Sequence, residues 1–265
     1  VSFDEGIQKA KTKIERDSSK LQVDGLKGAS RALFLARLVQ STTRAMVVLT
    51  PNQNTGETLI GDLKYFYKFN NIKSVPRFFP TWELLPYENL SPVSEIMGER
   101  LEILNLIQRN EVPLLVVPVE AIMQCVMPRR ELSSQTFTIM KGETLEREFL
   151  ETCLFDNGFA RIPMVENRGE FSVRGDIIDI YPPALSNPLR IEFFDNRIES
   201  IREFDISSQV SLKVIERLEI LPVREVSPTS GQKEAGLEKI SQLAREHGAD
   251  PAGVKELTDK IQHLD

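Results

Sequence analysis

LQVDGLKGASRALFLARLVQSTTRAMVVLT, residues 21–50, places a glycine-containing turn and a helix between two apolar segments. Residues 21–23 predict a short strand, residues 25–30 a tight turn, and residues 31–40 a helix with an apolar face. Residues 45–49 are a continuous apolar run, which is typical of a strand that is covered on both faces. This order of strand, helix and strand favours an α/β fold with a parallel sheet.

The same alternation continues towards residue 128. A helix that opens at Thr50-Pro51-Asn52 is expected to continue to about Phe69, followed by a strand over residues 75–79 and a buried strand over 114–117. Ser91 followed by proline predicts the start of a further helix, because a hydroxyl caps the helix and proline suits its first turn. With four strands alternating with helices, we expect a mostly parallel sheet that has helices on both sides.

The pattern changes after Pro128, where short strand-like segments replace the alternation. One helix is expected around residues 144–157, and Asp195-Asn196-Arg197 predicts the turn of a β-hairpin. We therefore predict three parts: an α/β domain at residues 1–128, an inserted antiparallel α+β domain at 129–222, and a return to the first domain with C-terminal helices at 223–265.

The turn at residues 25–32 has the spacing of a phosphate-binding loop without its chemistry. Such a loop needs G-x-x-x-x-G-K-[ST] between a strand and a helix, with lysine on the phosphates and a hydroxyl on Mg²⁺. Here Ser30 stands in place of the second glycine, Arg31 in place of lysine and Ala32 in place of the hydroxyl residue. Two interpretations follow, an ordinary helix N-terminus or a degenerate phosphate loop without hydrolysis, made of Gly25, Gly28, Ser30, Arg31 and Ala32.

The composition argues against several classes of site. The net charge of −6 makes DNA a poor first guess as the main partner, and no apolar run approaches the length of a membrane span. His247 and His263 are the only histidines, and they lie far from both cysteines in the sequence. We expect no metal site, no catalytic residue and a cytoplasmic location. Since the chain begins with Val1, we also expect it to be part of a longer protein.

Several segments resemble the bacterial transcription-repair coupling factors (the Mfd family), and they also resemble the excision-repair protein UvrB. Together they cover roughly residues 20–226 in the same order. The disabled loop favours the coupling factors, because UvrB keeps its ATP site at this position. The matching segments are LPYENLSP (85–92), Arg100-Leu101, VPVEAIMQ (117–124), GEFSVRGDIIDIYP (169–182), IEFFD (191–195) and IREFD (201–205).

The resemblance implies a RecA-like domain with a degenerate phosphate loop, similar to UvrB domain 1, that carries an inserted domain similar to UvrB domain 2. It implies that residues 129–222 bind UvrA and so start nucleotide excision repair. The complete protein would be an ATP-driven DNA translocase that removes stalled RNA polymerase. Its motor, which uses ATP and Mg²⁺, would lie outside this chain, as would its contacts with DNA and RNA polymerase. No cofactor is expected here, and no membrane partner.

The resemblance also implies the residues that contact UvrA. Arg161 and Arg174 match two arginines with which UvrB binds UvrA, whereas a third falls on Ser172 here. Guanidinium groups suit an acidic partner, because each can bind a carboxylate through two N–H groups. Phe171 and Tyr181 are candidate aromatic anchors.

Plainer interpretations remain for these residues. Arg174 could pair with Asp176 or Asp179 at a sheet edge, and both aromatic rings could lie in the core of their domain. Two other functions also stay open for the chain. It could be a nucleotide- or DNA-binding repair domain, or a clamp that restrains the motor and the C-terminal domains of its own protein.

Overall fold

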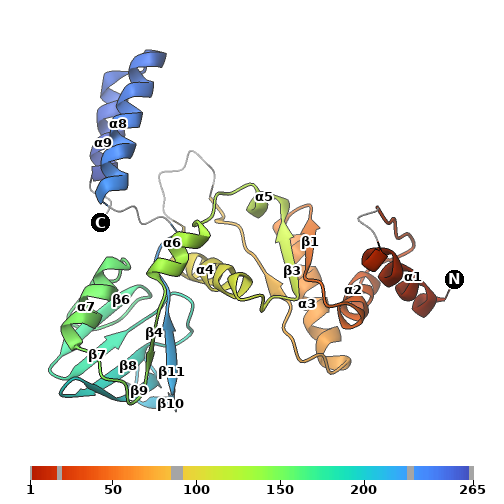
Figure 1. Ribbon diagram of the computed structural model, residues 1–265, viewed down its shortest axis with the longest axis horizontal. Coiled ribbons are helices and arrows are strands. Elements are labelled where there is room, and N and C mark those ends of the chain that lie inside the picture. The colour runs from red at the N-terminus through yellow and green to blue at the C-terminus, as the bar shows by residue number, and fades with distance from the viewer. Residues whose placement is uncertain (1, 17–19, 85–91, 226–229, 263–265) are drawn as a thin grey trace.

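The computed structural model describes residues 2–16, 20–84, 92–225 and 230–262. An α/β unit, a strand-rich unit and a C-terminal helical hairpin occupy separate regions of the molecule (Figure 1). The helices are α1 (Phe3–Arg16), α2 (Ser30–Ser41), α3 (Gln53–Phe69), α4 (Ser94–Gln108), α5 (Val119–Ile122), α6 (Arg129–Gln135), α7 (Arg147–Asp156), α8 (Ser230–His247) and α9 (Pro251–Gln262). The strands are β1 (Met46–Thr50), β2 (Arg77–Phe78), β3 (Leu114–Pro118), β4 (Phe137–Met140), β5 (Ala160–Arg161), β6 (Glu170–Arg174), β7 (Ile177–Ile180), β8 (Leu189–Phe194), β9 (Arg197–Phe204), β10 (Ser211–Val214) and β11 (Arg217–Ile220).

The α/β unit contains a parallel sheet with the strand order β1-β3-β2. The parallel arrangement confirms the prediction from the sequence, but the described residues form three strands there and not four. Residues 21–23 are not a strand, and the side chains of Leu21 and Val23 are exposed. A strand needs a hydrogen-bonding neighbour, and none of the three strands pairs with this segment.

Helices cover both faces of the central strand β3. Leu114 and Val116 pack with α2 and α3, while Leu115 and Val117 pack with α4 on the other face. The prediction of a fully covered strand is wrong for β1, since Val47 is 61% exposed and Leu49 54%. The cluster on the α4 side includes residues of β3 and none of β1, so half of the edge strand stays uncovered.

A side-chain cap marks the start of α3, whereas α4 begins later than the sequence predicts. Asn52 caps α3, as its side chain accepts a hydrogen bond from the backbone N–H of Thr55 at 2.9 Å. Helix α4 begins at Ser94, so Pro92 precedes the helix instead of lying in its first turn. Ser91, the expected cap, lies outside the described residues.

The strand-rich unit is built on a six-stranded sheet with the order β10-β9-β8-β7-β6-β5. Its pairs are antiparallel as predicted, except that β5 runs parallel to β6. The hairpin between β8 and β9 confirms the turn prediction, and Asp195 adopts the positive φ of 53° that such a turn favours. One face of the sheet packs against α7 and the β4–β11 pair around a large apolar core.

Helix α4 joins the two units. The backbone of Pro183 and Ala184 passes so close to Gly98 that a Cβ atom there would lie 2.4–2.5 Å from it. Arg168 of the strand-rich unit pairs with Glu95 of α4 at 3.0 Å. After β11 the chain returns to the α/β unit, where Glu225 binds Arg100 of α4. The boundaries of the three predicted domains stay a prediction.

Candidate protein-interaction site

The second face of the six-stranded sheet, which we call the outer face, carries five charged side chains and one serine. It is defined by Ser172, Arg174, Asp179, Arg190, Glu192 and Arg202. Successive residues of a strand point to opposite sides, and cross-strand partners point to the same side. Ser172 pairs with Asp179 and Asp179 with Arg190, which places these three residues on one face.

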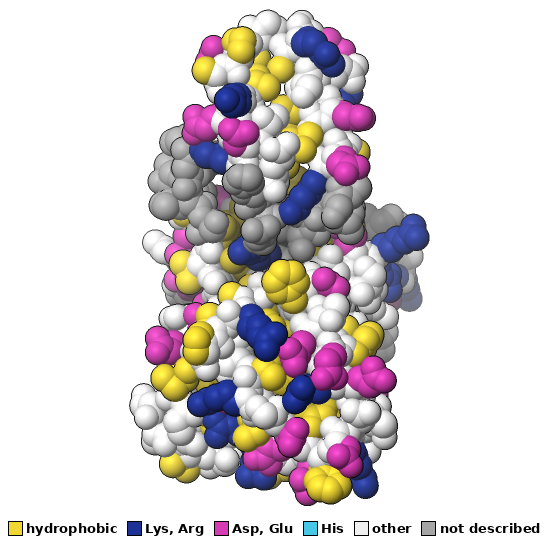
Figure 2. All heavy atoms as spheres, turned by 90° about the vertical axis from the view of Figure 1, so that its left-hand side faces the viewer, with side chains coloured by type: hydrophobic (Ala, Val, Ile, Leu, Met, Phe, Trp, Pro, Cys, Tyr) yellow, Lys and Arg dark blue, Asp and Glu magenta, His cyan; other side chains and the backbone are white. Residues whose placement is uncertain are grey.

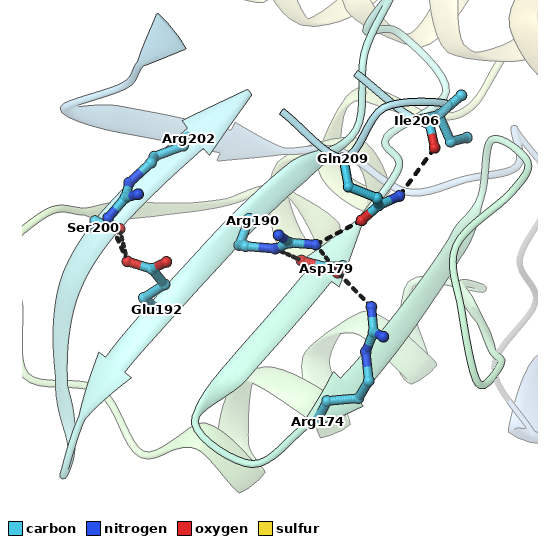
Figure 3. A network of polar contacts seen from close by, with 8 residues as sticks. All are labelled: Arg174, Asp179, Arg190, Glu192, Ser200, Arg202, Ile206 and Gln209. Carbon is cyan, nitrogen blue, oxygen red and sulfur yellow. Dashed lines mark hydrogen bonds and ion pairs between the residues drawn. The ribbon is translucent and has the colours of Figure 1, made fainter. Parts of the chain in front are cut away.

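Asp179 is the centre of a hydrogen-bonded network on the outer face (Figure 3). Its side chain is 3% exposed and accepts from Arg190 through Nε at 2.7 Å and Nη2 at 2.9 Å. Arg174 donates to the same carboxylate through Nη2 at 3.2 Å. Arg190 also donates to Gln209 at 2.9 Å and lies 4.6 Å from the centre of the Phe204 ring. Two guanidinium groups thus share one carboxylate and leave a local charge of +1.

The surroundings of Arg190 favour its protonated form. Hydrogen bonding to Asp179 raises the pKa of Arg190 above its ordinary value, while partial burial works against this shift. The negative charges of Asp179 and Glu192 raise the pKa further. Arg190 therefore stays protonated, and its planar group can hold the buried carboxylate in one orientation.

A second ion pair lies further along the same face. Glu192 accepts from Ser200 and from Arg202, each at 2.6 Å. Its cross-strand partners are Ile177 and Ser200, so it belongs to the same face as Arg174 without contacting it. Figure 2 shows basic, acidic and hydrophobic side chains interspersed over the strand-rich unit in its lower part.

The two predicted arginines do not form one cluster. Arg161 lies on β5 and is the register partner of Phe171, which places it on the core side of the sheet. There it pairs with Glu151 of α7 at 3.1 Å, and its side chain is 59% exposed. Arg174 lies on the outer face and is 53% exposed. A single flat partner surface therefore meets both arginines only around the β5–β6 edge of the sheet.

The structure contradicts the predicted role of Phe171. Its side chain is 2% exposed and belongs to the core cluster of the strand-rich unit, so it offers no ring to a partner. The alternation along β6 explains this result, because Phe171 and Arg174 lie on opposite sides of the strand. Tyr181 is half-buried, donates a hydrogen bond to Ser186 O at 2.8 Å and carries Arg168 over its ring.

The predicted phosphate loop adopts a different local structure. Gly25 and Gly28 have positive φ angles of 85° and 51°, but the loop follows an irregular segment and not a strand. The hydroxyl of Ser30 donates to Lys27 O at 2.7 Å, and Arg31 Nε approaches Leu26 O at 3.5 Å. Ala32 is fully buried against the sheet. The strand–loop–helix part of the prediction is therefore wrong, since the first strand is missing.

The described residues show neither a metal cluster nor a membrane-spanning helix. Within the described ranges, no group of three or more His, Cys, Asp or Glu side chains is placed to hold a metal ion. No helix in the same ranges is long and apolar enough to cross a membrane. The absence of a cofactor and the cytoplasmic location stay predictions.

Sequence reasoning missed the central role of Asp179 and Arg190. The expected pairing of Arg174 with Asp179 is present at 3.2 Å, whereas Asp176 lies in the turn before β7, is exposed and is 3.8 Å from Arg147. The available signal was a carboxylate between two isoleucines, Ile178 and Ile180, in a buried strand. A charge at such a position requires a partner, but the sequence does not say which one.

The strand-rich unit and the chain as a whole resemble known proteins. The family described as "UvrB interaction domain" matches residues 137–226. The chain is 34% identical to a transcription-repair-coupling factor of Myxococcus xanthus over 214 residues, which are 80% of this chain and 18% of that protein. It is 32% identical to the Bacillus subtilis protein of the same name, over 82% of this chain and 18% of the relative. It is 30% identical to the Escherichia coli protein of the same name, over 76% of this chain and 17% of the relative.

The chain spans less than a fifth of the length of these curated relatives. The family match, residues 137–226, covers the strands β4 to β11 of the strand-rich unit. The chain thus belongs to the transcription-repair-coupling factor family, and its residues 137–226 match the UvrB interaction domain.

Proposed function

We propose that this chain recruits UvrA through its strand-rich unit, and that the α/β unit serves as the scaffold that carries it. The observation that supports this most is Arg174, which is half exposed and held on the outer face within the matched UvrB interaction domain. A recruiting module needs an exposed, oriented side chain on a rigid element, because little entropy is then lost on binding.

The chemistry of Arg174 indicates an acidic partner surface. Only one of its N–H groups is engaged with Asp179, through Nη2, among the contacts of the described residues. The planar fork retains further donors for a carboxylate of UvrA. Arg161 offers a second, separate guanidinium at the β5 edge, where its present partner is Glu151.

The proposal assigns no catalytic role to this chain. Ala32 is buried where a phosphate loop would present a hydroxyl to Mg²⁺, and no strand leads into the turn. In the complete protein, an ATP-driven translocase motor outside this chain would displace stalled RNA polymerase from DNA. UvrA bound to this region would then begin nucleotide excision repair.

The test is a calorimetric titration of this chain with purified UvrA. We expect saturable binding that weakens by about tenfold or more in an Arg174→Ala variant. The matched control is Arg217→Ala, an exposed arginine on β11 in the two-stranded sheet, which should bind like the wild type. Absence of binding by the wild-type chain would overturn the proposal.

Separate Arg161→Ala and Arg174→Ala variants show which of the two arginines contacts UvrA. Since Arg161 and Arg174 lie on opposite sides of the sheet, loss of affinity in both variants would place UvrA around the β5–β6 edge. Loss in Arg174→Ala alone would place it on the outer face. A parallel titration with Mg-ATP tests the alternative, and saturable nucleotide binding without UvrA binding would favour a nucleotide-binding domain.

A further inference from the structure

The network on the outer face is a chain of hydrogen bonds that runs from Gln209 through Arg190 and Asp179 to Arg174. Gln209 lies in a turn whose backbone is fixed by a hydrogen bond from Gln209 N to Asp205 O at 2.7 Å. Arg190 donates one hydrogen bond to Gln209 and two to Asp179. Arg174 donates one hydrogen bond to Asp179. Each member is more exposed than Asp179, and the last member, Arg174, reaches the surface.

The buried carboxylate is fixed more firmly than a surface ion pair. Its two oxygens accept from Nε and Nη2 of Arg190 in a bidentate arrangement, which restricts rotation of the Asp179 side chain. Arg190 is in turn restricted by the Phe204 ring and Gln209. The position of Arg174 Nη2 is therefore set by the strand-rich unit as a whole and not by the rotamers of a free surface arginine.

We infer that Asp179 is a positioning residue for UvrA recognition, which holds Arg174 by one N–H so that the rest of its guanidinium fork faces a carboxylate of UvrA. This inference rests on the proposed function. It adds a buried residue to the interface that makes no contact with the partner itself, and it names the partner group as a carboxylate.

Net charge and positioning predict opposite effects on UvrA binding when Asp179 loses its charge. An Asp179→Asn variant makes the outer face more positive by one unit, which would strengthen attraction to an acidic partner if only the field mattered. A positioning role predicts weaker binding, because Arg174 loses its fixed partner. Glu192→Gln provides the matched control, since it adds the same charge to the same face and has no hydrogen bond to Arg174.

The experiment is a titration of UvrA with the wild-type chain, Asp179→Asn and Glu192→Gln, with the thermal unfolding of each chain measured in parallel. We expect Asp179→Asn to bind about fivefold or more weakly, while Glu192→Gln binds as well as the wild type or better. Equal or stronger binding by Asp179→Asn would overturn the inference. If the wild type binds and only this result fails, the proposed function stands without the positioning role.

Two further variants keep the inference testable if Asp179→Asn does not fold. Arg174→Lys changes an exposed side chain and keeps its charge, but an ammonium group cannot bind Asp179 and also present a planar fork. It should lose most of the affinity that Arg174→Ala loses, and wild-type affinity would overturn the inference. When Asp179→Asn folds, combining it with Arg174→Ala should cost less than the sum of both single effects, whereas additive losses would contradict the coupling.

Discussion

Arg100 and Glu225 lie 125 positions apart in the sequence and form a buried ion pair at the junction of the two units. The side chain of Arg100 is fully buried and that of Glu225 is 3% exposed. Arg100 Nε and Nη2 both donate to the carboxylate, and Nη1 donates to Pro80 O at 2.7 Å. Trp82 Nε1 donates to Glu225 at 3.0 Å, so the returning chain is tied to the segment that follows β2.

We predict that this pair dominates the stability of the junction. An Arg100→Met variant should lower the free energy of unfolding by about 3–5 kcal/mol, because it leaves a carboxylate buried without its charge partner. Chemical denaturation measures the change.

The double variant Arg100→Met, Glu225→Met should recover part of this loss, since no unpaired charge then remains buried. As a surface control, Glu256→Gln breaks the exposed pair with Lys260 and should leave the unfolding midpoint unchanged. A mild effect of Arg100→Met, similar to that of the control, would contradict the prediction.

A second prediction concerns the contact of α4 with the loop after β7. Gly98→Ala adds a methyl group 2.4–2.5 Å from the backbone between Pro183 and Ala184 and from Pro183 Cβ, so helix and loop must then move apart. We expect a loss of about 1–3 kcal/mol in the free energy of unfolding. Gly61→Ala on α3 is the matched control, because nothing lies within 4 Å of its added methyl group. That variant should gain up to about 1 kcal/mol from helix propensity. A gain in both variants would show that the approach at Gly98 is not tight.

A third prediction tests the degenerate phosphate loop. The triple variant Ser30→Gly, Arg31→Lys, Ala32→Ser restores the sequence pattern, yet we expect it not to bind Mg-ATP. Position 32 is buried against the sheet, and the segment before the turn is not a strand, so the backbone cannot form the phosphate cradle. Titration with a fluorescent ATP analogue measures binding. Saturable, Mg²⁺-dependent binding by the triple variant would show that only the three side chains had been lost.

A fourth prediction concerns alkaline pH. Burial raises the pKa of Tyr67 to about 12, and its ring packs between α3 and the sheet. Below about pH 10, the ordinary pKa of tyrosine, Tyr67 is neutral in the folded and the unfolded state, so it causes no pH dependence of stability there. As the pH rises from about 10 towards 12, the unfolded state ionises first, and stability falls by at most about 1.4 kcal/mol per pH unit.

Thermal unfolding between pH 7 and pH 11 tests this prediction. Tyr67→Phe should match the wild type near pH 7 and retain more stability above pH 10, since it has no hydroxyl to ionise. Tyr65→Phe is the control on the same helix, where the ring is 64% exposed, and it should follow the wild-type curve. If Tyr67→Phe follows that curve as well, another group governs the alkaline loss.

Local patterns in the sequence predicted much of the fold. The apolar run at β3, the helices α2 and α3 and the turn between β8 and β9 each follow from short-range chemistry. The segment at residues 169–182 also carried the resemblance to the family that the comparisons support. The contacts with UvrA stay a prediction, and among the candidate residues Arg174 is exposed whereas Phe171 lies in the core.

The amino-acid sequence by itself determined the alternation of strands and helices from β1 to β3, the change to mostly antiparallel pairing after it, and the absence of a lysine at position 31 and of a hydroxyl residue at position 32. These features depend on residues that are close together along the chain. Tertiary structure alone decided that residues 21–23 remain outside the sheet, that Asp179 meets Arg190, and that Arg100 meets Glu225. A strand requires a neighbouring edge and a buried charge requires a partner, and distant parts of the chain supply both only after it has folded.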